Sequence, residues 1–473
     1  MRIVQTFWTA GRDPLKYSFG WTHPEYNLMS WALSCLSLRE HYDEVVLYTD
    51  QEGYNVLINK LHLPYTEVNV VYDKNLYLPH HWAYAKIKTY SMQTKPFIHV
   101  DGDVYLPKPI PKNIINAPLI AQNKEIGTGY YRDMMYRVLH NPRMQLPVCV
   151  TKGLQEDSIG SYNMGVFGGS NLHFINQYCN EVQKFLNRNE MNNSENVNSK
   201  IECNVFFEQI LFAALVEEKQ EQVCCVINHD MYDQGYTISE FCNLYKFYEY
   251  PMHHLLGGHK RNIYVQRMLR HSLAYMYPTM FKTIFELTQK RKQISMLNLP
   301  KFPKILEGTL TTFSELLEQQ ITKWSKLSLN SYLEYEAFCY GSTKIESYKT
   351  MSTFVCNPYL CLYTFKYKRK EGNDETDDMI QLRRLFHCEK NFPLKDIAII
   401  PDLIGDGYEL VPLIPIDIKI IDAIRSGANS ISSIRKSIFL AHQMEVRKIT
   451  YLTNYIIEEI NHLIIHNILI KKK

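Results

Sequence analysis

The chain has 473 residues, enough for two or three domains of ordinary size. Hydrophobic residues make up 45% of it and charged residues 21%, which excludes a chain that is disordered throughout. The formal net charge of +3 excludes a protein that coats nucleic acid through overall basic charge, although local basic patches stay open.

Cysteine usage and hydropathy bear on where the protein works. The eleven cysteines are scattered and odd in number, which is typical of reduced thiols in a cytoplasm. The N-terminal segment lacks the apolar run of a signal peptide. No stretch approaches the roughly 18 uninterrupted apolar residues of a membrane span. We therefore expect a soluble, cytoplasmic protein.

Strands alternate with helices over the first 110 residues. The apolar patterns predict strands at 2–8, 44–49 and 97–100, an extended segment at 66–73, and helices at 26–41 and 82–92. This alternation favours an α/β fold with a parallel sheet and helices on both faces. Ligands of such sheets bind beyond the carboxyl ends of the strands.

The middle of the chain is mainly helical by pattern. It carries an asparagine-rich surface loop at 187–199, an apolar helix at 203–215, helical stretches at 262–292 and 313–338, and a loop of mixed charge at 366–378. The proline-punctuated segment at 297–304 is the best domain boundary. We therefore expect domains at 1–295 and 391–473, joined by a mainly helical connecting region at 305–390.

The last 60 residues have a more definite pattern. Ile416, Ile420, Ile421 and Ile424 lie on one face of a helix that ends at Gly427, and Ser430 is placed to cap a second helix. A third helix is expected at 447–466, and the strand DIAIIPD precedes all three. This order predicts a winged-helix-like module.

The first motif with chemical content is Asp101-Gly102-Asp103, directly after the strand FIHV. Two carboxylates at i and i+2 past a strand end can bind a divalent cation, and such oxygen ligands suit Mg²⁺ or Mn²⁺. Gly102 lets the backbone turn sharply between them. A chance loop triplet is the alternative.

The second motif is His254-Leu-Leu-Gly257-Gly258-His-Lys260. A neutral imidazole of His254 can complete the metal shell. The two glycines let backbone N–H groups approach a phosphate, whose charge Lys260 would neutralise. A glycine-containing loop with a core histidine is the alternative.

The third motif is the glycine-rich segment YNMGVFGGS at 162–170, followed some forty residues later by Glu208 and Gln209. Glycines beside a short strand allow close approach of a ligand. Asn163 and Gln209 can hydrogen-bond hydroxyl groups in fixed geometry. A glycine-rich strand in the centre of the sheet is the alternative.

The order and spacing of these motifs resemble the GT-A glycosyltransferases, and more narrowly glycosyltransferase family 8. The resemblance covers about residues 1 to 265, and the pairing of D-x-D with H-x-x-G-x-x-K is its most specific part. It implies transfer of a sugar from a nucleotide diphosphate, with UDP the expected nucleotide, to an acceptor hydroxyl or thiol. It also implies a Mn²⁺ or Mg²⁺ cofactor and retention of anomeric configuration.

The resemblance assigns roles to residues at matching positions. Asp101, Asp103 and His254 would hold the metal, and Gly257 and Lys260 the diphosphate. His253 adjoins His254, so the choice between them depends on motif register.

The nucleotide and sugar positions follow in the same way. Thr6, Trp8 and Thr9 stand where the family's first strand meets the base and ribose, although the chain lacks the usual Asp-rich loop there. Lys86 would contact donor phosphate or sugar. The remaining residues are assigned to the sugar and the anomeric carbon: Asn163, Gly165, Gln209 and Glu208, the last replacing the usual aspartate.

The C-terminal module resembles the winged-helix-like leader-peptide recognition domains found with peptide-modifying enzymes, which would make the acceptor a peptide. A cell-surface glycan is the other acceptor class. A helical cap or dimerisation element is the alternative for the module itself. Two further functions stay open: a degenerate transferase that only binds nucleotide, and a winged-helix protein that binds DNA or peptide. The three lysines at the end of the chain would allow a weak contact with an anionic membrane surface.

Overall fold

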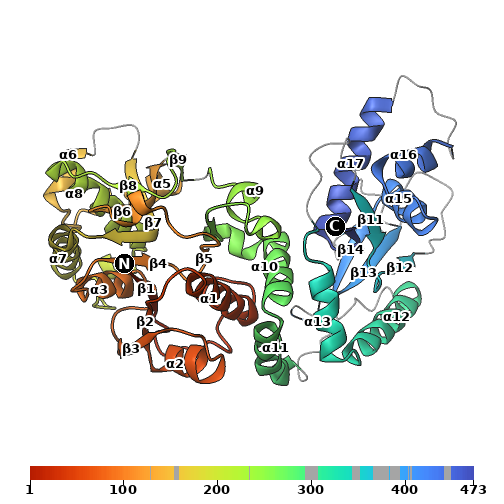
Figure 1. Ribbon diagram of the computed structural model, residues 1–473, viewed down its shortest axis with the longest axis horizontal. Helices are drawn as coiled ribbons and strands as arrows, with labels where there is room; N and C mark the ends of the chain where they lie inside the picture. The colour runs from red at the N-terminus through yellow and green to blue at the C-terminus, as the bar shows by residue number, and fades with distance from the viewer. Residues whose placement is uncertain are drawn as a thin grey trace. The chain divides into compact units, whose positions relative to one another are not determined.

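The computed structural model describes residues 1–127, 129–153, 159–233, 235–292, 307–342, 352–365, 383, 395–402, 404, 407–440 and 449–472. These residues divide into two compact units, Met1–Leu269 and Arg270–Lys473 (Figure 1). The expected boundary at 297–304 and the mixed-charge loop at 366–378 lie outside the described residues.

The first unit is built on an eight-stranded sheet with the order β3-β2-β1-β4-β7-β6-β8, and β9 also pairs with β6. The strands are β1 (Arg2–Phe7), β2 (Val45–Asp50), β3 (Glu67–Tyr72), β4 (Phe97–Val100), β6 (Ile120–Gly127), β7 (Ile159–Gly169), β8 (Cys224–Cys225) and β9 (Met231–Tyr232). The four strands from β3 to β4 are parallel, as the alternating pattern predicts. The α/β class is therefore confirmed.

The second half of this sheet is mixed. Strand β7 runs antiparallel to both β4 and β6, whereas β8 and β9 are parallel to β6. The glycine-rich segment therefore does form a central strand. At its end Gly168 has a φ of +155°, and a Cβ there would lie 2.1 Å from the carbonyl oxygen of Phe97. The glycine lets β7 and β4 approach closely, so it has a packing role.

Both faces of the sheet are covered. Ile3 packs into one hydrophobic core and Val4 into the other, because successive side chains of a strand point to opposite faces. The larger core includes α3 (Tyr84–Ser91), α5 (Tyr130–Leu139), α7 (Leu172–Arg188) and α8 (Leu211–Lys219), and the other includes α1 (Pro24–Arg39). Shorter elements complete the unit: α2 (Gln51–Tyr54), α4 (Lys112–Ile115), α6 (Val148–Gly153) and α9 (Ile238–Phe241).

The second unit begins inside α10 (Ile263–Met276) and continues with α11 (Pro278–Lys292), α12 (Glu307–Ser325) and α13 (Leu329–Phe338). A two-stranded sheet pairs β11 (Thr353–Cys356) with β15 (Leu469–Lys472). A three-stranded sheet joins β12 (Cys361–Thr364), β13 (Asp396–Asp402) and β14 (Gly407–Leu413). These strands share cores with α12 and with the last three helices.

The three C-terminal helices form where the isoleucine pattern predicts them. They are α15 (Pro415–Arg425), α16 (Ile431–Leu440) and α17 (Ile449–Ile465). Gly427 has a φ of +100°, which suits a glycine after a helix end. The Ser430 hydroxyl accepts a hydrogen bond from the Ser433 N–H at 3.2 Å, so the expected cap of α16 is confirmed.

Among the helices of the described residues, none combines the length and apolar character needed to cross a membrane.

Candidate metal centre and adjoining polar site

Asp101 and Asp103 lie on the turn that follows β4, at the carboxyl ends of the parallel strands. The Asp101 N–H donates to the Gly165 carbonyl at 2.9 Å, which ties this turn to β7. A Cβ on Gly102 would lie 2.5 Å from the Trp31 ring, so only glycine lets the turn pack there. The two carboxylates are therefore fixed by the sheet on one side and by α1 on the other.

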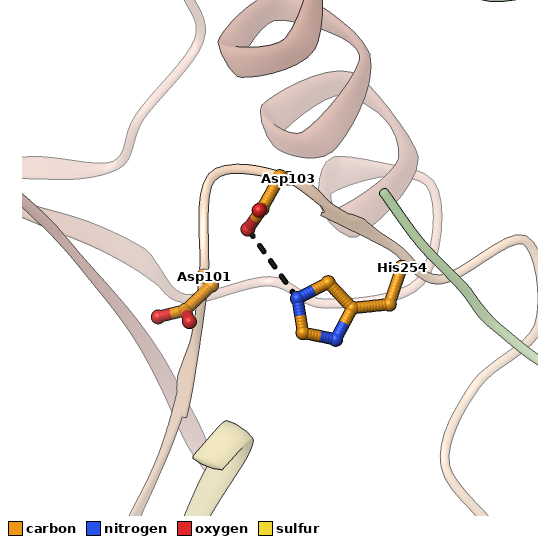
Figure 2. A group of neighbouring side chains, drawn as sticks. All are labelled: Asp101, Asp103 and His254. Carbon is orange, nitrogen blue, oxygen red and sulfur yellow. Dashed lines mark ion pairs between the residues drawn. The ribbon is translucent and has the colours of Figure 1, made fainter. Parts of the chain in front are cut away.

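His254 comes to the same end of the sheet from a distant part of the chain. It lies in the short strand β10 (His253–His254), which pairs antiparallel with β5 (Val104–Tyr105), immediately after the aspartates. Its Nδ1 is 2.8 Å from Gln122 Oε1, an atom that only accepts hydrogen bonds. Nδ1 therefore carries the proton, and the lone pair of Nε2 faces Asp103, whose Oδ1 is 3.7 Å away (Figure 2).

Burial also keeps this imidazole neutral. Desolvation lowers the pKa of His254 to about 4, and the lysines nearby lower it further, although Asp103 opposes them. A neutral ring with an oriented lone pair is the form that binds a metal ion.

The three side chains form a group that can hold a metal ion. One ligand atom from each of Asp101, Asp103 and His254 lies within 4.8 Å of the others, and Figure 2 shows the two carboxylates and the ring gathered around the turn. Two carboxylates and one imidazole are a donor set that suits a divalent cation. The neighbouring His253 instead faces the Phe247 carbonyl through Nε2 at 3.0 Å, so His254 is the one histidine of the pair in the group.

Two lysines balance the carboxylates. Lys86 Nζ is 2.9 Å from Asp101 and also contacts Glu208, while Lys260 Nζ is 2.6 Å from Asp103. Burial alone would raise both aspartate pKa values. Lys260 and His254 outweigh it at Asp103, whose pKa falls, whereas the pKa of Asp101 stays raised. The expected metal and phosphate residues thus share one electrostatic cluster.

Beside this cluster lies a polar site centred on Glu125, a buried residue of β6. Its carboxylate contacts the hydroxyls of Tyr131 and Tyr236 and accepts a hydrogen bond from Asn163 Nδ2 at 2.9 Å. Tyr131 also contacts Gln209 Oε1. Burial raises the pKa of Glu125, although these hydrogen bonds oppose the rise.

The structure brings most of the expected site residues together. Gly165 packs against His254 and Gln122, since a Cβ there would lie 2.5 Å from Gln122 Oε1. Glu208 and Gln209 lie in the π-helical turn η3 (Phe206–Ile210), a conformation often found at functional sites. Glu208 is buried against Lys86, whereas Gln209 extends to the Glu125 site.

The glycines of the second motif lie in an open turn, η5 (Gly257–Arg261). Gly257 has a φ of +53°, a left-handed conformation that favours glycine. Gly257 and Gly258 are both exposed, and a Cβ built on either would meet open space.

Thr6, at the end of β1, and Trp8 and Thr9, in the loop that follows it, have contacts of their own. Thr9 is buried and bonds Asp50 Oδ2 through both its N–H and its hydroxyl, at 2.9 and 2.8 Å. Trp8 donates its ring N–H to the Asp73 carbonyl at 3.0 Å. The Thr6 hydroxyl is 2.6 Å from that of Thr89. Thr9 and Trp8 therefore support the loop after β1.

Sequence reasoning missed Gln122, Glu125, Tyr131 and Tyr236. The first two lie on β6 in the run IAQNKEIG, where polar residues interrupt an otherwise buried strand. Polar groups inside a buried strand need hydrogen-bond partners. The polar residues within this apolar run were therefore the sequence signal for a polar site. The tyrosines carried no comparable signal in a chain with 34 of them.

Comparison with known proteins gives one family match, which covers the first unit and the start of the second. Residues 1–287 match the profile of a family described as "Family of unknown function (DUF6734)". No curated protein matches the sequence.

Proposed function

Because this chain belongs to DUF6734, a family of unknown function, we propose its activity from the site itself: it is a metal-dependent glycosyltransferase of GT-A type. The donor is a sugar nucleotide, with a UDP-sugar favoured, and the acceptor is a hydroxyl or thiol. The observation that carries the proposal is the group formed by Asp101, Asp103 and His254 at the carboxyl edge of the sheet, with Lys260 beside it.

The two acidic ligands and the imidazole would hold Mn²⁺ or Mg²⁺. Such an ion supplies Lewis-acid stabilisation of the charge that develops on a departing diphosphate. Lys260 would move from Asp103 to a phosphate oxygen, and the open backbone at Gly257 and Gly258 would donate N–H groups to the same phosphate.

Lys86 has a different task from Lys260. It is buried and in contact with two carboxylates, and their charges raise its pKa in spite of its burial. It therefore stays an ammonium ion that orients Asp101 and adds positive charge at the site. Glu208 is a positioning residue in this proposal, because its carboxylate faces Lys86.

The donor sugar would lie at the Glu125 site. Asn163 and Gln209 offer amide groups for sugar hydroxyls, and the small Gly165 leaves room near the metal ligands. With the oriented amide groups close to the reacting carbon, positioning would supply much of the rate acceleration. Attack by the acceptor on the face that the diphosphate leaves would retain anomeric configuration.

If the acceptor is a peptide, the second unit would bring it. Its three helices and associated strands support a winged-helix-like module, and a peptide could add to the edge of a β-sheet there.

The proposal is tested by nucleotide release. The full chain is incubated with Mn²⁺ and a panel of nucleotide sugars without acceptor, beside Asp103→Asn and the exposed-site control Asp43→Asn. We expect slow hydrolysis of one donor, at least about tenfold slower in Asp103→Asn because a metal ligand is lost, and unchanged in the control.

Two results would contradict it. The first is absence of turnover together with absence of metal-dependent UDP binding by calorimetry. The second concerns the stereochemistry alone: an inverted anomer in the released sugar, observed by NMR at early times, would exclude retention.

A further inference from the structure

One tryptophan of this chain is exposed. Trp8, Trp21, Trp31 and Trp324 are buried, whereas Trp82 keeps 51% of its surface accessible. A large aromatic ring left in water forgoes the free energy that burial would supply. A single exposed apolar side chain is ordinary on a protein surface. Whether Trp82 has a function therefore depends on how its backbone is held and on which residues its ring contacts.

The backbone on both sides of Trp82 is held in place. The rings of His80 and His81 both contact the Ser199 carbonyl, the second at 3.0 Å. On the other side, the Ala83 N–H donates to Asn204 Oδ1 at 3.1 Å, and Asn204 Nδ2 donates to the His80 carbonyl at 2.7 Å. Trp82 is therefore presented to solvent from a fixed backbone, which lowers the entropy cost of binding a ligand.

The ring is directly linked to the candidate site. Lys86 Nζ lies 5.9 Å from the centre of the Trp82 ring, and the same ammonium contacts Asp101 and Glu208. Gln209 follows Glu208 in η3 and contacts Tyr131, whose neighbour Tyr130 is 49% exposed. The exposed Trp82 ring thus lies one contact away from the residues proposed to act on the donor.

We propose that Trp82 is a stacking platform for a pyranose ring of a saccharide acceptor. This inference rests on the proposed function and names the acceptor class of the same site. A flat aromatic face fits the C–H-rich face of a pyranose. A peptide acceptor would instead be recognised along a strand edge or in side-chain pockets.

The experiment is saturation-transfer NMR on the full chain with simple saccharides. The probes are methyl β-D-galactoside, methyl α-D-glucoside, methyl N-acetyl-β-D-glucosaminide, lactose and maltose. We expect transfer to the ring protons of at least one of them. This transfer should be weakened at least about fivefold in Trp82→Ala and retained in Trp82→Phe, which keeps an aromatic face. Tyr275→Ala, which removes an exposed ring of the second unit, serves as the matched control and should bind as the wild type does.

Calorimetry with Mn²⁺ and UDP on the same proteins separates this inference from the proposed function. We expect Trp82→Ala to bind UDP as the wild type does. If saccharides bind through Trp82 while UDP does not bind, the transferase proposal fails and the platform stands.

Four outcomes would overturn the platform. One is saccharide binding that Trp82→Ala leaves unchanged, and another is the absence of saccharide binding by the wild type. A third is binding of serine-containing peptides, and of no saccharide, at Trp82. The fourth is a Trp82→Ala variant that loses binding of a nucleotide sugar but keeps binding of the free saccharides, which would assign the ring to the donor.

Discussion

At the scale of single residues, Gly165 leaves no room for a side chain beside the candidate metal centre. A Cβ there would lie 2.6 Å from His254 Cε1, so Gly165→Ala must displace the imidazole. We expect about tenfold weaker Mn²⁺ binding by calorimetry, the effect of disturbing a ligand's support. Gly160→Ala is the matched control in the same strand, because nothing lies within 4 Å of its Cβ. Equal Mn²⁺ affinity in the two variants would contradict the assignment of His254.

The buried His81 gives the protein a measurable dependence on pH. Burial lowers its pKa to about 4, and the neighbouring His80 adds to this, although the bond to Ser199 opposes it. The unfolded chain, with a histidine pKa of about 6.5, then binds more protons than the folded chain between these values. The contribution of His81 to stability is complete above pH 6.5 and is lost as the pH falls towards 4.

His81→Gln isolates this contribution, since glutamine keeps a donor for Ser199 but does not titrate. We expect the unfolding free energy of the wild type, relative to the variant, to fall by at most about 1.4 kcal/mol per pH unit below pH 6.5. Urea unfolding at pH 7.5, 6 and 5 measures it. A difference that does not change with pH would show that His81 is not buried in its neutral form.

Single residues also show which parts of the candidate site can be predicted from the sequence. The D-x-D triplet was found because both carboxylates lie on one local turn after an apolar strand. Glu125 was not found, because its meaning depends on Tyr131 and Tyr236, which reach it from other elements. Such convergence is a property of strand register and helix packing, and neither is visible in a local pattern.

At the scale of elements, the cap of α16 provides a direct test. The Ser430 hydroxyl accepts the Ser433 N–H, so Ser430→Ala leaves that donor without its partner. We expect a loss of about 1 kcal/mol in unfolding free energy, measured by urea denaturation. Ser430→Asp should keep most of the wild-type unfolding free energy, because an aspartate caps a helix about as well as a serine does. If both variants lose the same stability, the hydroxyl is serving another contact.

Element boundaries were predictable where local chemistry fixes them. The strands β1, β2 and β4 followed from short apolar runs, and α15 to α17 from isoleucine spacing and a glycine stop. The helical stretch at 262–292 was expected as one, but the structure has two helices there, α10 and α11, which meet at Tyr277. Pro278 is the reason, because the residue before a proline is disfavoured in helical conformation. The asparagine-rich surface loop ends in Asn198 and Ser199, both of which are buried.

At the scale of the whole molecule, two compact units predict two unfolding transitions. Mn²⁺ with UDP should raise the transition of the first unit alone, because a ligand stabilises only what it binds. Ser430→Ala should lower the other transition alone. Differential scanning calorimetry of the full chain measures both. A single transition that shifts as a whole in each experiment would show that the units unfold together.

The assembly of the candidate metal centre has a consequence for biosynthesis. Asp101 and Asp103 are made early, whereas His254 follows its partner Gln122 by 132 positions and enters through the two-residue pairing of β10 with β5. A chain still emerging from the ribosome therefore carries two acidic ligands without the third. Tight capture of the proposed ion would have to wait until nearly all of the first unit has been synthesised. Metal uptake would then report that this unit is complete, and fragments that stop before β10 would remain unloaded.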